Sequence, residues 1–222
     1  MEKREIVLGW LRIVLGLLVF ALGIHLTIFA NVGLLSWDVL GMGISYHTPL
    51  NYGLSMTAIS VTVLIVDLLL RERIGFGTII DALLTGNFVQ MFNDLNPFPL
   101  NENFWIGILI LLAGLIVAAL GMWIYMAAGQ CCGPRDALLV GLGKRLPKLP
   151  IGLVEIMIFG AVLLVGWLLG GPVGIGTLIG TFGIGFAIQL VFSLVGFEPR
   201  NVKHRSVREA LRILSRKDPA EN

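Results

Sequence analysis

Six long apolar stretches constrain the fold of this chain more than any other feature of its sequence. They lie at about residues 8–30, 52–70, 76–94, 105–128, 151–170 and 175–197. The third and sixth are the richest in glycine, threonine and amide side chains. Because about 20 apolar residues in a helix cross the hydrocarbon core of a bilayer, the sequence predicts an all-α integral membrane protein with six transmembrane helices.

The composition supports this class and excludes others. Of 222 residues, 56% are hydrophobic and only 14% are charged, whereas about a quarter of a typical soluble domain is charged. A soluble enzyme, a disordered regulator and a nucleic-acid binder are therefore excluded. The two cysteines, Cys131 and Cys132, are adjacent and form neither a disulfide framework nor a zinc motif. We expect no metal, no cofactor and no enzymatic activity. The first apolar stretch is too long for a signal peptide and is read as a retained helix.

The positive charges fall in alternate connections between the apolar stretches. All 16 Lys and Arg residues lie at the N-terminus, after the second and fourth stretches, or after the sixth. The connections 31–51, 95–104 and 171–174 contain none. The positive-inside rule therefore places both termini in the cytoplasm. The basic tail, 199–222, has the periodicity of an amphipathic helix on the inner leaflet, with partner binding as the alternative.

The two halves of the chain resemble each other. Equivalent elements recur at an offset of 98 or 99 residues: Gly9, Gly16 and Gly23 with Gly107, Gly114 and Gly121; Gly75-Phe76-Gly77-Thr78 with Gly174-Ile175-Gly176-Thr177; and Gly86 and Gln90 with Gly185 and Gln189. Residues 1–99 and 100–198 each hold three spans, and an odd number inverts the second half. This predicts an inverted repeat, a plan common among transporters. The glycines every seven residues indicate close helix packing or, alternatively, a place on the solute pathway.

Each half also contains a segment too short to cross the bilayer, at 36–46 and 134–145. Ser36 is a candidate N-cap, and Pro134 suits the first helical position. Asp38 and Asp136 then lie in the first turn, where the helix dipole favours negative charge. We expect short helices that are re-entrant or lie on the surface. Their N-terminal N–H groups suit an anionic or carboxylate-bearing solute, although the aspartates could simply cap their own helices.

Trp37 and Arg135 occupy equivalent positions beside these aspartates. Trp37 lines a pathway or belongs to an interfacial aromatic belt. Arg135 holds an anionic group, pairs with a carboxylate, or follows the positive-inside rule.

The polar side chains of the third and sixth stretches are further candidates for the site. Polar groups in lipid are costly unless they face the protein interior or a water-filled cavity. We therefore expect Thr78, Thr177, Gln90 and Gln189 to line a cavity between the repeats. The two glutamines could instead bond neighbouring helices.

Isolated carboxylates within the stretches are candidates for ion coupling. Asp81 lies in the third stretch and Glu155 in the fifth. Glu155 could alternatively pair with Lys148 or Arg145. Asp67 is expected to pair with Arg71, four residues later.

Three motifs suggest a family. Ser-Trp-Asp-Val-Leu at 36–40, Gly-Pro-Arg-Asp-Ala-Leu at 133–138 and Gly-x-Gly-Thr at 174–177 resemble the YczE/YyaS/YitT family of bacterial integral membrane proteins, and the YczE branch most closely. The resemblance spans most of the chain and implies a protein of the bacterial inner membrane with a suspected transport function.

The sequence as a whole favours a small secondary transporter or exporter of a small polar organic solute, bound at the repeat interface. The expected substrate-binding residues are Ser36, Trp37, Asp38, Thr78, Gln90, Arg135, Asp136, Thr177 and Gln189. A channel with two opposed short helices, or a scaffold that modulates a cytosolic enzyme, are the alternatives. The expected partners are the lipid bilayer and the solute, with a homodimer left open and nucleic acid excluded.

Overall fold

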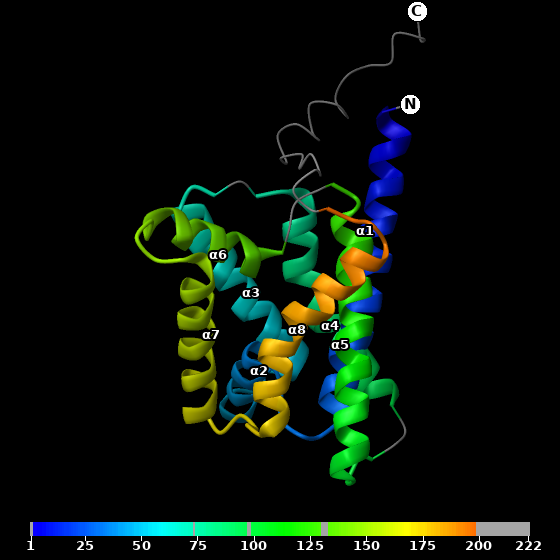
Figure 1. Cartoon of the computed structure of the whole chain (residues 1–222), viewed down its shortest axis with the longest axis vertical. Coiled ribbons are helices and arrows are strands. Elements are labelled where there is room, and N and C mark those ends of the chain that lie inside the picture. The colour runs from blue at the N-terminus through cyan, green and yellow to red at the C-terminus, as the bar shows by residue number, and fades with distance from the viewer. Residues whose placement is uncertain (1, 73, 97–98, 130–132, 199–222) are drawn as a thin grey trace, which may run out of the picture.

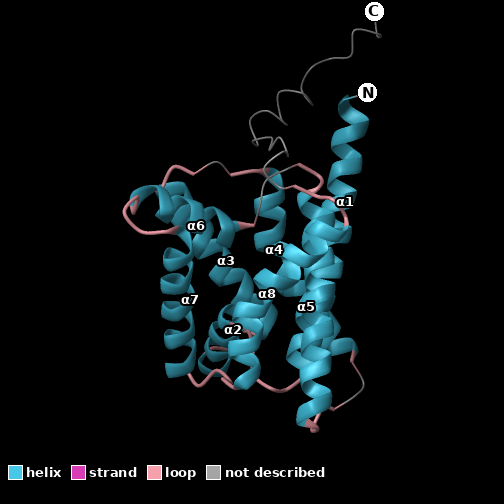
Figure 2. Ribbon diagram, in the orientation of Figure 1, coloured by secondary structure: helices cyan, strands magenta, loops and turns pink. Residues whose placement is uncertain are grey.

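A computed structural model describes residues 2–72, 74–96, 99–129 and 133–198. These residues form eight helices and no strand (Figure 2). The helices are α1 Glu2–Phe29, α2 Ser36–His47, α3 Tyr52–Leu69, α4 Phe76–Leu95, α5 Phe104–Met126, α6 Pro134–Arg145, α7 Ile151–Leu168 and α8 Ile175–Leu194. The predicted basic tail, 199–222, and the Cys131–Cys132 pair lie outside the described residues.

The helix boundaries follow local signals in the sequence. The Asn51 side chain caps α3 by accepting a hydrogen bond of 2.9 Å from the Leu54 N–H. Asn103 caps α5 in the same way, and Pro134 opens α6 as predicted. The predicted N-cap at Ser36 is wrong, because Leu35 occupies the cap position and makes no side-chain capping bond. Ser36 is instead the first helical residue, and its hydroxyl is free to bond elsewhere.

The order of helix lengths repeats along the chain. The short helices α2 and α6 have 12 residues each, α3 and α7 have 18 each, and α4 and α8 have 20 each. Each half therefore consists of a long helix, a short helix and two further long helices.

The first long helices of the two halves, α1 and α5, pack against each other along one side of the molecule (Figure 1). Figure 1 shows α1 and α5 side by side along the long axis, and they pack closely. A β-carbon placed on Gly121 would lie 2.8 Å from the Gly16 carbonyl oxygen, and one on Gly114 would lie 2.9 Å from the Gly23 oxygen. The predicted packing role of these glycines is confirmed, since any side chain there would push the two backbones apart.

The last helix of each half packs on the first, whereas the short helix of each half packs on the other half. α4 packs on α1 and α8 packs on α5, while the short helix α2 packs on α7 and the short helix α6 packs on α3. The short-helix contacts involve equivalent residues: Gly43 lies against Leu169, and Gly141 lies against Leu70. The chain is therefore a single interlocked unit in which neither half packs independently of the other.

Five helices of the described residues are long and apolar enough to cross a membrane: Leu8–Phe29, Tyr52–Leu69, Phe104–Met126, Ile151–Leu168 and Ile175–Leu194. α4 has 20 residues, as the predicted sixth span requires, but its composition is more polar. It lies against α1 and α3, and its Asn93 Oδ1 accepts a hydrogen bond of 2.7 Å from Nδ1 of His25 in α1. Much of its polarity therefore serves contacts inside the protein.

The predicted pairing of Asp67 with Arg71 is wrong. Arg71 is exposed and has a positive φ of 54°, which ends α3 and turns the chain away. Asp67 is fully buried, and neither carboxylate oxygen has a hydrogen-bond partner among the described residues. The cation pairs in this region instead join α6 to the α3–α4 connection, where Lys144 and Arg145 both pair with Glu72.

Candidate functional site

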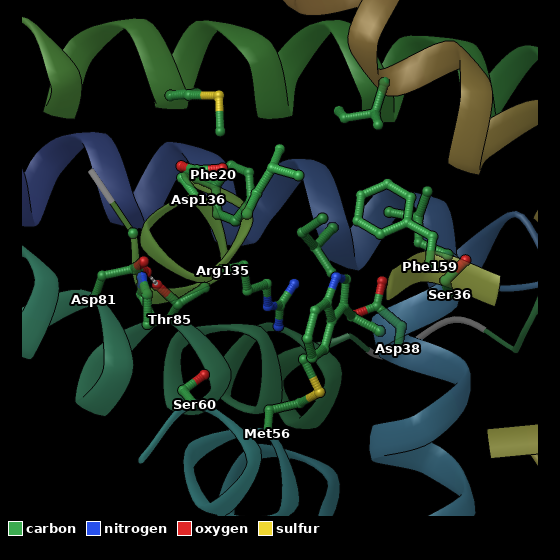
Figure 3. Close-up of a pocket in the computed structure, with 18 of the residues that line it drawn as sticks. Phe20, Ser36, Asp38, Met56, Ser60, Asp81, Thr85, Arg135, Asp136 and Phe159 are labelled. Carbon is green, nitrogen blue, oxygen red and sulfur yellow. Dashed lines mark hydrogen bonds between the residues drawn. The ribbon is translucent and has the colours of Figure 1, made fainter. Parts of the chain in front are cut away.

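A cavity of about 180 Å³ lies where the two halves meet, and side chains from all eight helices line it. Figure 3 shows the polar part of its wall, with Arg135 in the middle, Asp81 to one side and Asp38 to the other. The starts of α2 and α6 both reach the cavity, although they lie 98 residues apart in the sequence. The fold thus assembles one site from equivalent segments of both halves.

The start of α2 contributes three consecutive residues to the cavity wall. The hydroxyls of Ser36 and Thr181 share a hydrogen bond of 3.0 Å, which ties α2 to α8. Asp38 is buried, and its Oδ1 accepts a hydrogen bond of 2.9 Å from the Tyr52 hydroxyl at the start of α3. Asp38 therefore has a partner within the protein and is held in place by it.

Trp37 and Arg135 meet across the cavity. The guanidinium carbon of Arg135 lies 4.8 Å from the centroid of the Trp37 ring, within the range of a cation–π interaction. Trp37 is only 7% exposed, so it does not belong to a belt at the membrane surface. Its indole Nε1–H is buried and has no acceptor among the described residues. Trp37 and Arg135, which occupy equivalent positions in the two halves, thus contact each other.

The start of α6 brings carboxylates to the same cavity. Asp136 accepts a hydrogen bond from the Gly133 N–H, the N-cap of α6, and so stabilises its own helix as one sequence interpretation proposed. The Thr85 hydroxyl donates to Asp81, and a β-carbon on Gly133 would lie 2.5 Å from the second oxygen of Asp81. A side chain at this position would therefore displace the Asp81 carboxylate from its place beside the start of α6.

The electrostatics of the cavity are dominated by one cation among several carboxylates. Arg135 interacts electrostatically with Asp38, Asp81 and Asp136. Asp136 also interacts with Asp81 and Glu155, which are like charges when all are ionised. Arg135 makes no ion pair with any of these carboxylates. The salt bridges among the described residues all involve Glu72. The guanidinium thus lies among carboxylates without being bound to one.

Glu155 is exposed and lines the cavity from α7. Its alternative pairing with Arg145 is not found, because Arg145 contacts Glu72 and the carbonyl oxygens of Gly141 and Leu70. Among the described residues no ion pair joins Glu155 to Lys148 either. Glu155 also lines a second opening, of about 340 Å³, that lies between α7 and α8. It therefore stands where the cavity meets this opening.

Two of the predicted binding residues cap their own helices. Thr78 and Thr177 are buried, and their hydroxyl oxygens accept hydrogen bonds of 3.3 and 3.0 Å from the N–H groups of Gly75 and Gly174. Thr177 lines the α7–α8 opening, whereas Thr78 lines neither the cavity nor the opening. The repeated Gly-x-Gly-Thr motif thus acts as a helix-start signal in both halves.

Gln90 and Gln189 occupy equivalent positions but different surroundings. Gln90 Oε1 accepts a hydrogen bond of 3.2 Å from the Gly53 N–H of α3, and its Nε2 donates to Asp94. Gln189 is exposed and has no hydrogen bond with any described residue. Neither glutamine lines the cavity.

We expect Thr177→Val to lower the stability of the protein without changing ligand binding. Valine has nearly the shape of threonine but leaves the Gly174 N–H without its acceptor, which costs about 1 kcal/mol. For a chain of this length the thermal midpoint should fall by roughly 2–4 °C. Thermal unfolding of Thr177→Val and of its matched variant Thr78→Val in detergent measures this. Loss of ligand binding at an unchanged midpoint would contradict the capping role.

The sequence interpretation missed Tyr52 and Ser60, both of which are buried in α3 beside the cavity. Tyr52 holds Asp38, and Ser60 lines the cavity wall. Neither residue has an equivalent of the same type in the second half, where Ile151 and Phe159 stand. The repeat that pointed to the other residues therefore gave no signal for these two.

The described residues contain no group of three His, Cys, Asp or Glu side chains that could hold a metal ion. The carboxylates at the cavity come from separate helices and are spread around Arg135. The polar groups at the cavity are therefore one guanidinium, several carboxylates and a few hydroxyls.

Comparisons with known proteins agree with the resemblance seen in the sequence. Relatives include an uncharacterized protein of Haemophilus influenzae, 30% identical over 83% of this chain and 86% of its own, and the uncharacterized membrane protein YczE of Bacillus subtilis, 29% identical over 80% and 82%. The YyaS protein of Bacillus subtilis is 29% identical over 74% of this chain and 83% of its own. No solved structure matches the chain significantly. A family of unknown function, DUF6198, matches residues 7–193. The chain is thus a helical membrane protein that belongs to the DUF6198 family, with relatives of the YczE branch.

Proposed function

We propose that the chain is a secondary transporter that carries a small organic solute by alternating the access of its central cavity. In this proposal α4 is the sixth span, the halves 1–99 and 100–198 form an inverted repeat, and the protein lies in the bacterial inner membrane. The exchange of equivalent contacts between the halves supports the repeat, since α2 packs on α7 and α6 packs on α3.

The observation that carries the proposal is that equivalent helix pairs are packed in one half and apart in the other. α3 packs on α4, where a β-carbon on Gly53 would lie 2.9 Å from the Gly86 carbonyl oxygen. The equivalent helices α7 and α8 make no comparable contact, and β-carbons on Gly152 and Gly185 would meet nothing within 4 Å.

The hydrogen bond that joins α3 to α4 has no counterpart between α7 and α8 among the described residues. Gln90 accepts from the Gly53 N–H, but the equivalent Gln189 does not reach the Gly152 N–H. The second half therefore carries the residues for a closed contact that it does not make in this conformation. Two nearly equal packings of one helix pair are the kind of bistable element that a conformational switch requires.

The open side supports an assignment of the conformation within this proposal. α7 begins at the end of the molecule where α6 and the N-terminus of α1 lie (Figure 1). This end carries Lys144, Arg145 and Lys148, and by the positive-inside rule it is cytoplasmic, as are both termini. The described state is then open to the cytoplasm between α7 and α8 and closed on the outer side by α3 and α4. In the outward-open state we expect α7 and α8 to pack while α3 and α4 separate.

The two other functions considered make different demands. A channel needs both ends open at once, whereas α3 and α4 close one end here. A scaffold needs no change between α7 and α8. Closure of α7 on α8 therefore separates the carrier from both alternatives.

Cysteine cross-linking tests this closure without knowledge of the solute. In a Cys131→Ser, Cys132→Ser background, the pair Gly152→Cys and Gly185→Cys is oxidised in native membrane vesicles, and free thiols are counted with a maleimide-coupled polymer. A disulfide forms only when the two α-carbons come within about 4.4–6.8 Å. We expect this pair to cross-link, because the equivalent Gly53 and Gly86 are already in contact.

The matched control is Gly160→Cys with Gly185→Cys. Gly160 also lies on α7 and faces open space. Its equivalent in the first half is Val61, and no atom of Val61 is among those nearest to a β-carbon on Gly86. We expect no cross-link for this pair. Failure of the first pair to cross-link, or equal cross-linking of both, would overturn alternating access.

A further inference from the structure

We infer that the cavity binds a small zwitterion, a solute that carries both a protonated amine and a carboxylate and has an apolar body about the size of leucine. The inference rests on the proposed carrier function and names the class of solute for that same cavity.

One hydrogen-bond donor group at the cavity has no acceptor among the described residues. The Arg135 guanidinium carbon lies 4.8 Å from the centre of the Trp37 ring, and its N–H groups donate to no described residue. A planar guanidinium with a free edge is matched by a carboxylate, which accepts two parallel hydrogen bonds from it. One end of the solute is therefore a carboxylate.

The carboxylates at the cavity favour a cation. Four carboxylates line it, namely those of Asp38, Asp81, Asp136 and Glu155, and Arg135 is the one basic side chain among the described lining residues. Asp38, Asp81 and Asp136 have neutral hydrogen-bond partners, in Tyr52, Thr85 and Gly133. These bonds fix the carboxylates but do not offset their charge. A protonated amine placed between Asp81, Asp136 and Glu155 offsets part of it.

The rest of the wall sets the size and character of the solute. Phe20, Ile24, Phe159 and Ile184 supply apolar surface to the cavity. An apolar cavity of about 150 Å³ holds a molecule as large as benzene, so the 180 Å³ here suits a body of similar size with two polar groups. Leucine has these properties.

A solute that carries only the carboxylate or only the amine matches the cavity less well. A simple anion would satisfy Arg135 but would lie among carboxylates. A simple amine would pair with the carboxylates but would leave the Arg135 donors without an acceptor, in a place where unmet donors are costly.

Three matched probes test the inference on the purified full chain in detergent. They are leucine, isopentylamine, which lacks the carboxylate, and 4-methylpentanoate, which lacks the amine. Their affinities are measured at equal concentrations by thermal shift and calorimetry. We expect leucine to bind at least about tenfold more tightly than either of the others, since each lacks one charge-assisted interaction.

The variant Arg135→Gln sharpens this test, because it removes the carboxylate partner and leaves the carboxylates of the wall. It should bind leucine no better than isopentylamine. Equal or tighter binding of isopentylamine or 4-methylpentanoate by the unmodified protein overturns the zwitterion, and so does a folded protein that binds none of the three. Cross-linking of Gly152→Cys to Gly185→Cys tests the carrier function independently of the solute. Closure without leucine binding overturns the solute class alone, and leucine binding without closure overturns the carrier alone.

Discussion

Gly152→Leu is expected to reduce transport at least about tenfold while the protein stays as stable as the unmodified chain. In the described conformation a side chain at Gly152 meets open space, and this residue lines the α7–α8 opening without lining the central cavity. Solute binding should therefore persist. In the closed state the same side chain would lie at the α7–α8 contact, where overpacking costs about 1–3 kcal/mol.

The matched variant is Gly53→Leu, the equivalent change in the first half. A β-carbon there would lie 2.7 Å from the Gln90 β-carbon and 2.9 Å from the Gly86 oxygen. The same overpacking now falls on the described conformation, so the thermal midpoint should drop by roughly 2–12 °C. Thermal unfolding of both variants and leucine exchange in proteoliposomes measure the contrast. Equal loss of stability in both variants, or full exchange by Gly152→Leu, would show that the two helix pairs do not alternate.

Arg135→Ala is expected to weaken leucine binding roughly 30-fold or more. Truncating one partner of a buried, hydrogen-bonded charge pair costs about 2–5 kcal/mol, because the other charge is left without a partner. In this variant the solute carboxylate would face Asp38, Asp81 and Asp136 with no cation between them. Calorimetry of the purified variant gives the change in affinity directly.

Two further variants test whether binding depends on the Arg135 guanidinium itself or only on the net positive charge of this region. Arg135→Lys keeps a cation but loses the planar guanidinium beside the Trp37 ring and its paired donors, so its affinity should fall between those of Arg135→Ala and the unmodified protein. Lys148→Ala removes a positive charge from an exposed residue between α6 and α7 and should bind leucine normally. If Lys148→Ala weakens binding as much as Arg135→Ala does, the net charge of this region is responsible and the Arg135 site is wrong.

The candidate site was predictable where both halves carry related residues, and where a lone carboxylate interrupts an apolar stretch, as at Asp81 and Glu155. The repeat pointed to Trp37 with Arg135 and to Asp38 with Asp136, and these residues do line one cavity. It pointed equally to Thr78 and Gln90, whose contacts are a helix cap and a helix–helix bond. A polar side chain in an apolar helix needs a partner in either case, so sequence pattern could not separate a wall residue from a structural one.

The sequence by itself determined the helices of this protein. Apolar length, together with the Pro, Asn and Gly-x-Gly-Thr start signals, sets helix boundaries because these depend on neighbours within one turn. Only the tertiary structure decided that α3 closes on α4 while α7 stands apart from α8. Both pairs carry the same glycines and glutamine, at 53, 86 and 90 and at 152, 185 and 189. Since the local contacts can form in either half, the choice between them depends on the packing energy of the whole molecule, which no single segment encodes.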